Sequence, residues 1–256
     1  MNNGHQSQCE NGIPLNHYKG FFFSFIFGCT RSSVNTEANY QRLVLSFVKR
    51  LFEGEFCNRI HMKNDVVAQI FVFRDYDDTE IFHLCKSPIY DRNNYKSVFD
   101  FSFYQMPDYG GFAKGCQSHC QDVLGGILYA MDSFHSFKEA KHYVFLCSNS
   151  SFHGVSSCHL KTNPNGILFM YIWNQLCTKI ISFNTFHFHI LMSNTNSDIQ
   201  ETIQKFEIIC KRIERIKCYD DSAFTYSISF FEKNIDIIKK YETILDTIIT
   251  NYMHDE

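Results

Sequence analysis

Short apolar runs alternate along this chain with stretches in which apolar residues recur every three or four positions. The apolar runs predict buried strands at 21–27, 66–73, 80–84, 141–147, 185–192 and 223–231. The three-to-four spacing predicts helices at 35–52, 95–103, 121–133, 167–178, 198–216 and 234–252. Strands that alternate with helices predict an α/β fold, with a mostly parallel central sheet of about six strands and helices on both faces.

The alternation runs through the chain without a low-complexity linker or an internal repeat. We therefore expect residues 20–256 to form a single domain, preceded by a polar, flexible lead-in at 1–19. The last predicted helix is strongly amphipathic, and we expect its apolar stripe to pack on its own sheet or, in part, to meet a partner. The stripe consists of Ile235, Ile238, Tyr241, Leu245, Ile248 and Ile249.

In parallel α/β sheets, ligands bind in the loops that follow the carboxyl ends of the strands. Those loops are expected at 28–35, 107–120 and 148–165. The adjacent Gly125 and Gly126 lack the Lys-Ser/Thr of a phosphate loop, so we expect them to let a helix approach the sheet closely. A salt-bridged turn at the sheet edge is expected from the charged residues Arg74, Asp75 and Asp78.

Composition and charge exclude several classes of function. The net charge of −3 and the pI near 6.4 give no bulk positive field that would hold nucleic acid. The longest apolar runs fall far short of the roughly 20 residues of a membrane span, so we expect no membrane insertion. The 11 cysteines, without the basic-then-apolar pattern of a signal peptide, predict reduced thiols in a cytoplasmic protein. The sequence leaves the oligomeric state unknown.

Four segments of the chain carry a family resemblance. They are FVFRDYDD (71–78), CQDVLGGILYAM (120–131), NSSFHG with a later histidine (149–154 and His159) and LCTKIISFNTFHFHI (176–190). Together they resemble the von Willebrand factor A-type (vWA) domains, in the subgroup found beside alpha-type protein kinases. The order and spacing of the segments agree over residues 20–231. The resemblance implies a Rossmann-like vWA fold with a metal-ion-dependent adhesion site at the carboxyl ends of the strands.

The resemblance also implies where the metal ligands of that site would fall. The family takes Asp-x-Ser/Thr-x-Ser from the first loop and one aspartate from each of two later loops. The first aspartate falls on Gly28, the two hydroxyls on Thr30 and Ser32, and the later aspartates on Ser118 and Asn149. All three carboxylates are therefore missing, and the sequence predicts a degenerate metal site.

Hydroxyl and amide oxygens supply the shape of such a site without the charge that offsets the dehydration of Mg²⁺. We therefore expect no metal and no cofactor. The protein is interpreted as a non-enzymatic interaction domain, without catalytic residues, that binds another protein through these loops. Arg31 stands where the family has a glycine and adds a positive charge. The residues expected to contact the partner are Arg31, Ser33, Asp108, Ser150 and His153.

Two alternatives follow from the same resemblance. One is a metal-assisted vWA domain that binds its ligand through Mg²⁺, with Asp108 as a carboxylate beside Thr30, Ser32 and Asn149. The other is a regulatory domain related to alpha-type kinase proteins. No kinase motif follows residue 231, so the chain itself is not expected to catalyse phosphoryl transfer.

Zinc binding and hydrolysis are two further kinds of chemistry that the residue types in these loops allow, beside a purely structural role. A zinc site would draw on thiols and imidazoles in or near the loops, but their spacing is loose and no Cys-x-x-Cys pair exists. Its candidates are Cys116, His119, Cys120, Cys147, His153, Cys158 and His159. A hydrolase would need an oriented nucleophile, and the serines near His153 lack the Gly-x-Ser-x-Gly elbow. Those serines are Ser148, Ser150 and Ser151.

Overall fold

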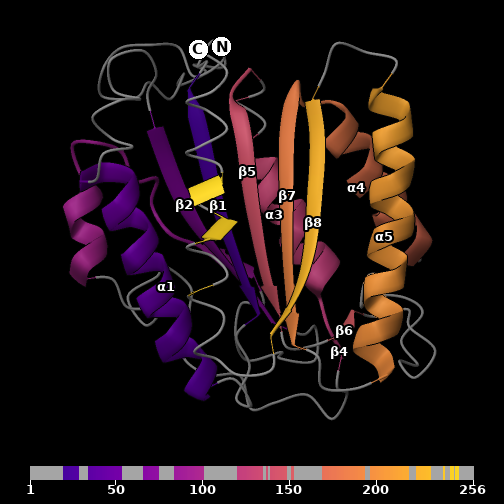
Figure 1. Ribbon diagram of the computed structural model, residues 1–256, viewed down its shortest axis with the longest axis horizontal. Coiled ribbons are helices and arrows are strands. Elements are labelled where there is room, and N and C mark those ends of the chain that lie inside the picture. Colours follow the sequence, from indigo (N-terminus) through magenta and orange to yellow (C-terminus); the bar gives the residue numbers. More distant parts are fainter. Residues whose placement is uncertain are drawn as a thin grey trace, which may run out of the picture.

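The computed structural model shows the arrangement of the strands and helices (Figure 1). It describes residues 20–28, 34–53, 66–74, 84–100, 120–134, 137, 139–148, 151–152, 169–193, 197–218, 223–231, 239, 243–244 and 246–247. Of the expected site residues, Gly28 alone lies within these ranges. The predicted lead-in at 1–19 lies outside them.

A six-stranded sheet forms the centre of the fold, in the order β3-β2-β1-β5-β7-β8. Its strands are β1 (Phe21–Gly28), β2 (Val66–Phe73), β3 (Leu84–Lys86), β5 (Lys141–Ser148), β7 (Thr185–Ser193) and β8 (Ala223–Phe231). All neighbours pair in parallel except β3, which runs antiparallel to β2. The predicted mostly parallel sheet is confirmed; its third strand, predicted at 80–84, is described at Leu84–Lys86, and residues 80–83 lie outside the description.

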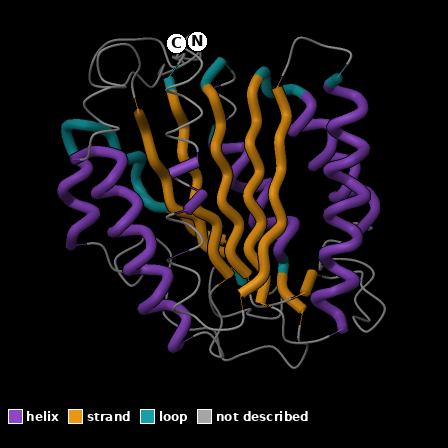
Figure 2. Tube along the Cα trace, in the orientation of Figure 1, coloured by secondary structure: helices purple, strands orange, loops and turns teal. Residues whose placement is uncertain are grey.

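The helices lie on both faces of this sheet (Figure 2). They are α1 (Val34–Glu53), the 3₁₀ helix η3 (Tyr95–Asp100), α3 (Val123–Ser133), α4 (Phe169–Ile181) and α5 (Ser197–Lys217). Each begins and ends within three residues of its predicted bounds, which confirms the periodicity of the apolar positions. None of the helices in the part of the chain that the structure describes is long and apolar enough to cross a membrane.

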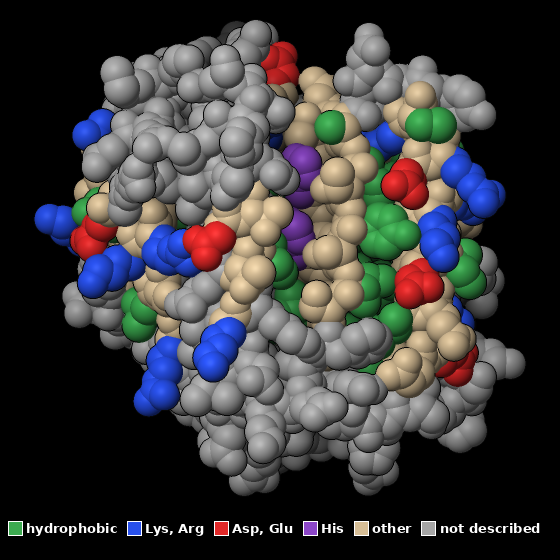
Figure 3. Space-filling model, in the orientation of Figure 1, with side chains coloured by type: hydrophobic (Ala, Val, Ile, Leu, Met, Phe, Trp, Pro, Cys, Tyr) green, Lys and Arg blue, Asp and Glu red, His purple; other side chains and the backbone are tan. Residues whose placement is uncertain are grey.

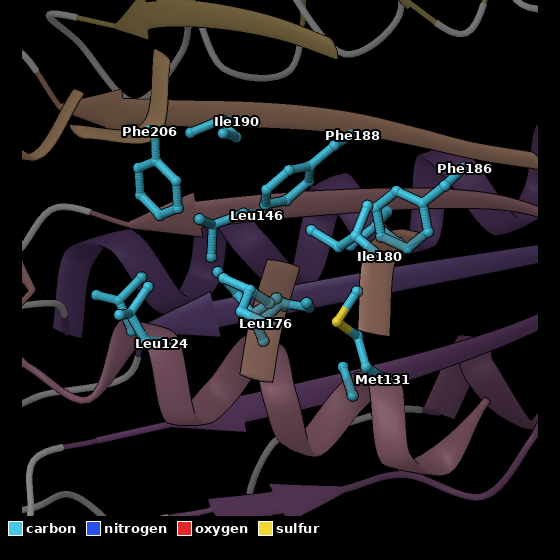
Figure 4. Packing of buried hydrophobic residues seen from close by; sticks show 14 of the residues in the cluster. Leu124, Met131, Leu146, Leu176, Ile180, Phe186, Phe188, Ile190 and Phe206 are labelled. Atoms are coloured by element: carbon cyan, nitrogen blue, oxygen red, sulfur yellow. The ribbon is translucent and has the colours of Figure 1, made fainter. Parts of the chain in front are cut away.

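Two apolar cores, one on each face, explain why β1 is apolar at almost every position. On one face, Phe22 and Ile26 of β1 pack with α3, α4 and α5. On the other face, four phenylalanines of β1 pack with α1: Phe21, Phe23, Phe25 and Phe27. A strand that is covered on both faces has no need of polar alternation. Figure 4 shows the larger core, in which Leu124 of α3 and Leu176 of α4 pack beside Leu146 of β5.

A pair of two-residue strands was missed by the sequence analysis. β4 (Cys120–Gln121) and β6 (Ser151–Phe152) form a separate parallel ladder. The apolar spacing predicts that a helix starts at Gln121, but this helix begins at Val123. Ser151 is predicted to lie in a loop, but it forms part of β6. Two residues are too short to show a period of two, so periodicity had no signal to find here.

The chain returns to the α1 face near its C-terminus. The described helical residues there include Ile244, which is partly buried against the core under α1. Asp246 forms an ion pair with Arg50 near the end of α1. The six side chains of the predicted apolar stripe lie outside the described residues.

Candidate functional site

The carboxyl edge of the sheet is the candidate site, because β1, β2 and β5 end there side by side. The chain passes from β1 to β2 on one side and later to β5 on the other, so the strand order reverses between β1 and β5, and such switch points open a crevice beyond the strand ends. The small β4–β6 ladder stands next to this edge, at the lower end of Figure 1, and α3 starts directly after β4.

Among the described residues, five polar side chains are buried at this edge, and we call them the edge cluster. Each is at most 5% exposed, although charged and amide side chains are usually at the surface. Arg74 follows β2, Ser148 ends β5, and the other three come from the β4–β6 ladder and the start of α3. The members are Arg74, Gln121, Asp122, Ser148 and Ser151.

Gln121 fills the space beside Gly28. A β-carbon built on Gly28 would lie 2.7 Å from Gln121 Oε1 and 3.0 Å from Cζ of Phe73. The resemblance to vWA domains puts the first metal-binding carboxylate on Gly28. At that position the chain has no side chain, and a neutral amide oxygen from β4 stands against the backbone instead.

Asp122 is a buried carboxylate of the cluster, and it is held by the helix that it begins. Its Oδ1 accepts a hydrogen bond from the N–H of Gly125 at 3.0 Å, which caps the N-terminus of α3. Its own N–H donates to the carbonyl oxygen of Arg74 at 3.1 Å, which joins β4 to the end of β2. The carboxylate therefore supports the local backbone rather than facing an open ligand position.

The two glycines of α3 are explained by close contacts. A β-carbon on Gly125 would lie 2.0 Å from Oδ2 of Asp122, so a side chain there would displace the cap. A β-carbon on Gly126 would lie 2.7 Å from Cβ of Phe73 on β2. The expectation that these glycines bring a helix close to the sheet is confirmed at Gly126, while Gly125 makes room for the capping carboxylate.

Arg74 is the described residue of the predicted salt-bridged turn, and it follows β2 at the carboxyl edge of the sheet. Its side chain is fully buried. A buried guanidinium carries its charge into a region of low dielectric, where electrostatic interactions are strong. Asp75 and Asp78 lie outside the described residues.

Most of the residues that the sequence singled out lie outside the part of the chain that the structure describes. These are Thr30, Arg31, Ser32, Ser33, Asp108, Ser118, Asn149, Ser150 and His153. Gly28 is described, and the structure brings it together with Gln121. Gln121 was missed, although the sequence held a signal for it: it precedes Asp122 in the segment CQDVLGG, which carries the family resemblance.

No set of three or more His, Cys, Asp or Glu side chains among the described residues could hold a metal ion. Among the predicted zinc candidates, Cys147 packs within the apolar core under α1, on the face of the sheet away from α3. The side chains of the remaining zinc candidates lie outside the description.

Two oxygens of the edge cluster have no hydrogen-bond partner within the described residues. They are Gln121 Oε1 and Ser151 Oγ, both buried. A buried acceptor without a partner costs about 1–3 kcal/mol, so these atoms favour any group that brings a donor to them. The arrangement can accept hydrogen bonds, but it places no free carboxylate charge at Gly28.

The solved structures that resemble this chain show its fold. The pilus adhesin SpaC from Lactobacillus rhamnosus GG, in an open conformation, aligns with a TM-score of 0.54 and 10% identity over 92% of this chain and 30% of the adhesin. A second structure of the same adhesin gives a TM-score of 0.53 and 10% identity, over 92% of this chain and 31% of the adhesin. The chain thus spans about a third of the length of these adhesins.

The ArnB paralog VWA2 from Sulfolobus acidocaldarius aligns more weakly, with a TM-score of 0.39 and 10% identity over 87% of this chain and 44% of that protein. No family model and no curated protein matches the sequence. The strand order and the adhesin match together show that the chain has a Rossmann-like α/β fold with a mostly parallel central sheet.

Proposed function

We propose that this protein is a non-enzymatic vWA-like interaction domain that binds another protein through the carboxyl edge of its sheet without a metal bridge. The observation that carries the proposal is the contact at Gly28, where the amide oxygen of Gln121 takes up the space next to the position of the family's first carboxylate. The fold shared with a pilus adhesin adds support for an interaction role.

The charge proposed for the edge favours a partner that carries negative charge. Arg31, from the first loop, would contribute a cation. Ser33, Asp108, Ser150 and His153 are proposed to complete the contact surface. Without carboxylates at Gly28, Ser118 and Asn149, the edge lacks the charge that would hold Mg²⁺.

The metal part of the proposal is tested by thermal unfolding with and without Mg²⁺. A metal that binds only the folded chain would stabilise it by about 2.7 kcal/mol at a hundredfold excess over Kd. We expect the melting temperature of the wild type to stay unchanged in millimolar Mg²⁺. A clear upward shift would instead support the alternative in which Asp108 holds the ion.

A restored site gives the reciprocal test. The variant combines Gly28→Asp, Ser118→Asp and Asn149→Asp with Arg31→Gly, which removes the competing cation, and Gln121→Ala, which removes the nearer of the two side chains that crowd Gly28. We expect it to gain Mg²⁺-dependent stability. The matched control carries Gly28→Asn and Ser118→Asn in the same Arg31→Gly, Gln121→Ala background and should not respond. A restored variant that folds but ignores Mg²⁺ would contradict the assigned positions.

The interaction part is tested by affinity capture in the presence of EDTA. We expect a protein that is captured by the wild type to be lost with Arg31→Glu and retained with Lys96→Glu. Lys96 is an exposed control on η3, next to Tyr95, which stacks on Phe52 at the far end of α1. Capture that requires added Mg²⁺, or that is insensitive to Arg31→Glu, would contradict the proposal.

The relation to alpha-type kinase proteins is the second candidate, and it rests on the segments FVFRDYDD and CQDVLGG. It proposes that the domain regulates a kinase rather than a separate partner. The length of the intact gene distinguishes the two: a kinase domain encoded in the same reading frame would favour the regulatory role.

A further inference from the structure

The two edges of the central sheet differ in how well they are protected. At one edge, β3 has three residues, includes the exposed Lys86, and is followed by an isolated bridge between Tyr90 and Ala68 of β2. At the other edge, β8 has nine residues, AFTYSISFF, without a charged residue or a proline. Short strands and lysines are the usual means of preventing edge-to-edge pairing, and β8 has neither.

β8 is also regular over its whole length, without a bulge. It pairs with β7 residue by residue from Thr185↔Ala223 to Ser193↔Phe231. The N–H of Ala223 donates to the carbonyl oxygen of Asn184 at 3.0 Å, so the odd-numbered residues bond toward β7. The backbone groups of Phe224, Tyr226 and Ile228 therefore point outward, and among the described residues no further strand pairs with them.

The side chains of β8 sort cleanly by face. On the α1 side of the sheet, the hydroxyls of Thr225 and Ser227 lie 2.7 Å from Nδ1 of His187 and 2.8 Å from Nδ1 of His189. On the α5 side, Phe224 is buried, and Tyr226 and Ile228 are partly buried against the larger core.

The histidines hold the hydroxyl face in place. The ring of His187 stacks on Tyr143 at a centroid distance of 4.4 Å, and the ring of His189 stacks on Phe145 at 4.9 Å. Each hydroxyl thus contacts a histidine whose ring is held by stacking on an aromatic neighbour. Because these side chains of β8 are already ordered, association would cost little further side-chain entropy. Figure 3 shows atoms of β8 at the surface on this face, between the two purple histidines and the side chains of α5.

We propose that β8 is a self-association strand: two copies of this chain pair antiparallel along β8, about a two-fold axis at Ser227, and form one continuous sheet. Serine 227 is the middle residue of β8, so this centre is the one that overlaps all nine residues. Tyr226 then faces Ile228 of the second copy, and their outward N–H and C=O groups bond to each other.

A second copy fits this edge because the strand is complementary to itself. Under the two-fold axis Thr225 faces Ser229, so hydroxyls meet hydroxyls and apolar side chains meet apolar side chains. No charge on β8 opposes a like charge on the other copy. An isologous contact of this kind closes as a dimer rather than growing into a filament. β8 is the last strand at one side of the sheet, whereas the proposed partner binds at the carboxyl ends of the strands. A failure of one proposal therefore leaves the other intact.

Sedimentation velocity of the full chain over a range of concentrations is the first test. We expect a concentration-dependent dimer for the wild type. The variant Thr225→Lys, Ser229→Lys places lysine opposite lysine in the dimer, and we expect the dimer to be lost. The matched variant Thr225→Lys, Ser229→Glu places lysine opposite glutamate in the same register, and we expect the dimer to return.

A cysteine at the two-fold axis tests the register directly. Ser227→Cys puts two thiols opposite each other, within the Cα separation that a disulfide allows. We expect mild oxidation to give a covalent dimer for Ser227→Cys and not for the wild type or for Thr225→Cys, whose residue faces Ser229. A wild type that stays monomeric at its highest soluble concentration, or a dimer that survives both lysines, would overturn the proposal.

Discussion

At the scale of single residues, the most informative position is Gly28, because a side chain there would collide with two neighbours. Its β-carbon would lie 2.7 Å from Gln121 Oε1 and 3.0 Å from Phe73 Cζ. We expect Gly28→Ala to lower the free energy of unfolding by about 1–3 kcal/mol, the usual cost of overpacking. Urea denaturation of the purified variant measures this.

The partner of that collision can be identified with a double-mutant cycle. Gln121→Ala removes the amide that stands nearest to Gly28, so we expect Gly28→Ala to cost less in this background than in the wild type. Equal costs in both backgrounds would mean that Phe73, and not Gln121, limits the space. In that case, a shift of the Phe73 ring would be enough to make room for a carboxylate at position 28, even with Gln121 in place.

At the scale of elements, α3 depends on a single capping side chain. Asp122 accepts the hydrogen bond from the N–H of Gly125, and capping residues of this kind contribute about 1 kcal/mol. We expect Asp122→Ala to destabilise the protein by about 1–2 kcal/mol and Asp122→Asn, which keeps the acceptor, to cost less. Two equal losses, measured by urea denaturation, would show that the charge matters and the cap does not.

The elements were predictable from the sequence to the extent that they are long and buried. β1 and β2 are eight-residue apolar runs, and α5 repeats its apolar positions over five turns, so their periods are evident. β4 and β6 have two residues each and leave no period. Their positions are set by contacts between distant parts of the chain, such as the bond from Asp122 N–H to Arg74.

The candidate site was predictable in its location and less so in its contents. The rule that ligands bind beyond the carboxyl ends of parallel strands predicts it at the end of β1, which is where the buried edge cluster lies. Neither the burial of Arg74 nor the contact between Gln121 and Gly28 follows from spacing along the chain, because each depends on how β4 lies against β2 and β1.

At the scale of the whole molecule, three histidines in the sheet are held neutral. Burial lowers the pKa of His142 to about 4, although the hydrogen bond from its ring to the carbonyl oxygen of Phe137 acts in the opposite direction. The ring of His142 packs among the rings of Phe22, Phe134 and Phe183. Burial also lowers the pKa of His187 to about 4, with Lys141 adding to the effect. The pKa of His189 falls to about 3, through burial and then His187.

The same histidines predict that the fold loses stability in mild acid. In the unfolded chain they titrate near pH 6.5, so between pH 6.5 and 4 the unfolded state binds protons that the folded state does not. Their contribution is complete above pH 6.5 and declines as the pH falls toward 4. His142 by itself should account for about 2 kcal/mol between pH 7 and pH 5.

Chemical denaturation at pH 7, 6 and 5 measures this dependence, with His142→Phe as the comparison. Phenylalanine fits the aromatic surroundings of His142 but cannot take up a proton. Whatever its absolute stability, the variant should therefore lose less stability between pH 7 and 5 than the wild type, by about 1.4 kcal/mol per pH unit at most. Equal slopes for the two proteins would show that His142 is already protonated, or reached by water, in the folded state. A wild type that became more stable on acidification would reverse the assignment of all three histidines as neutral.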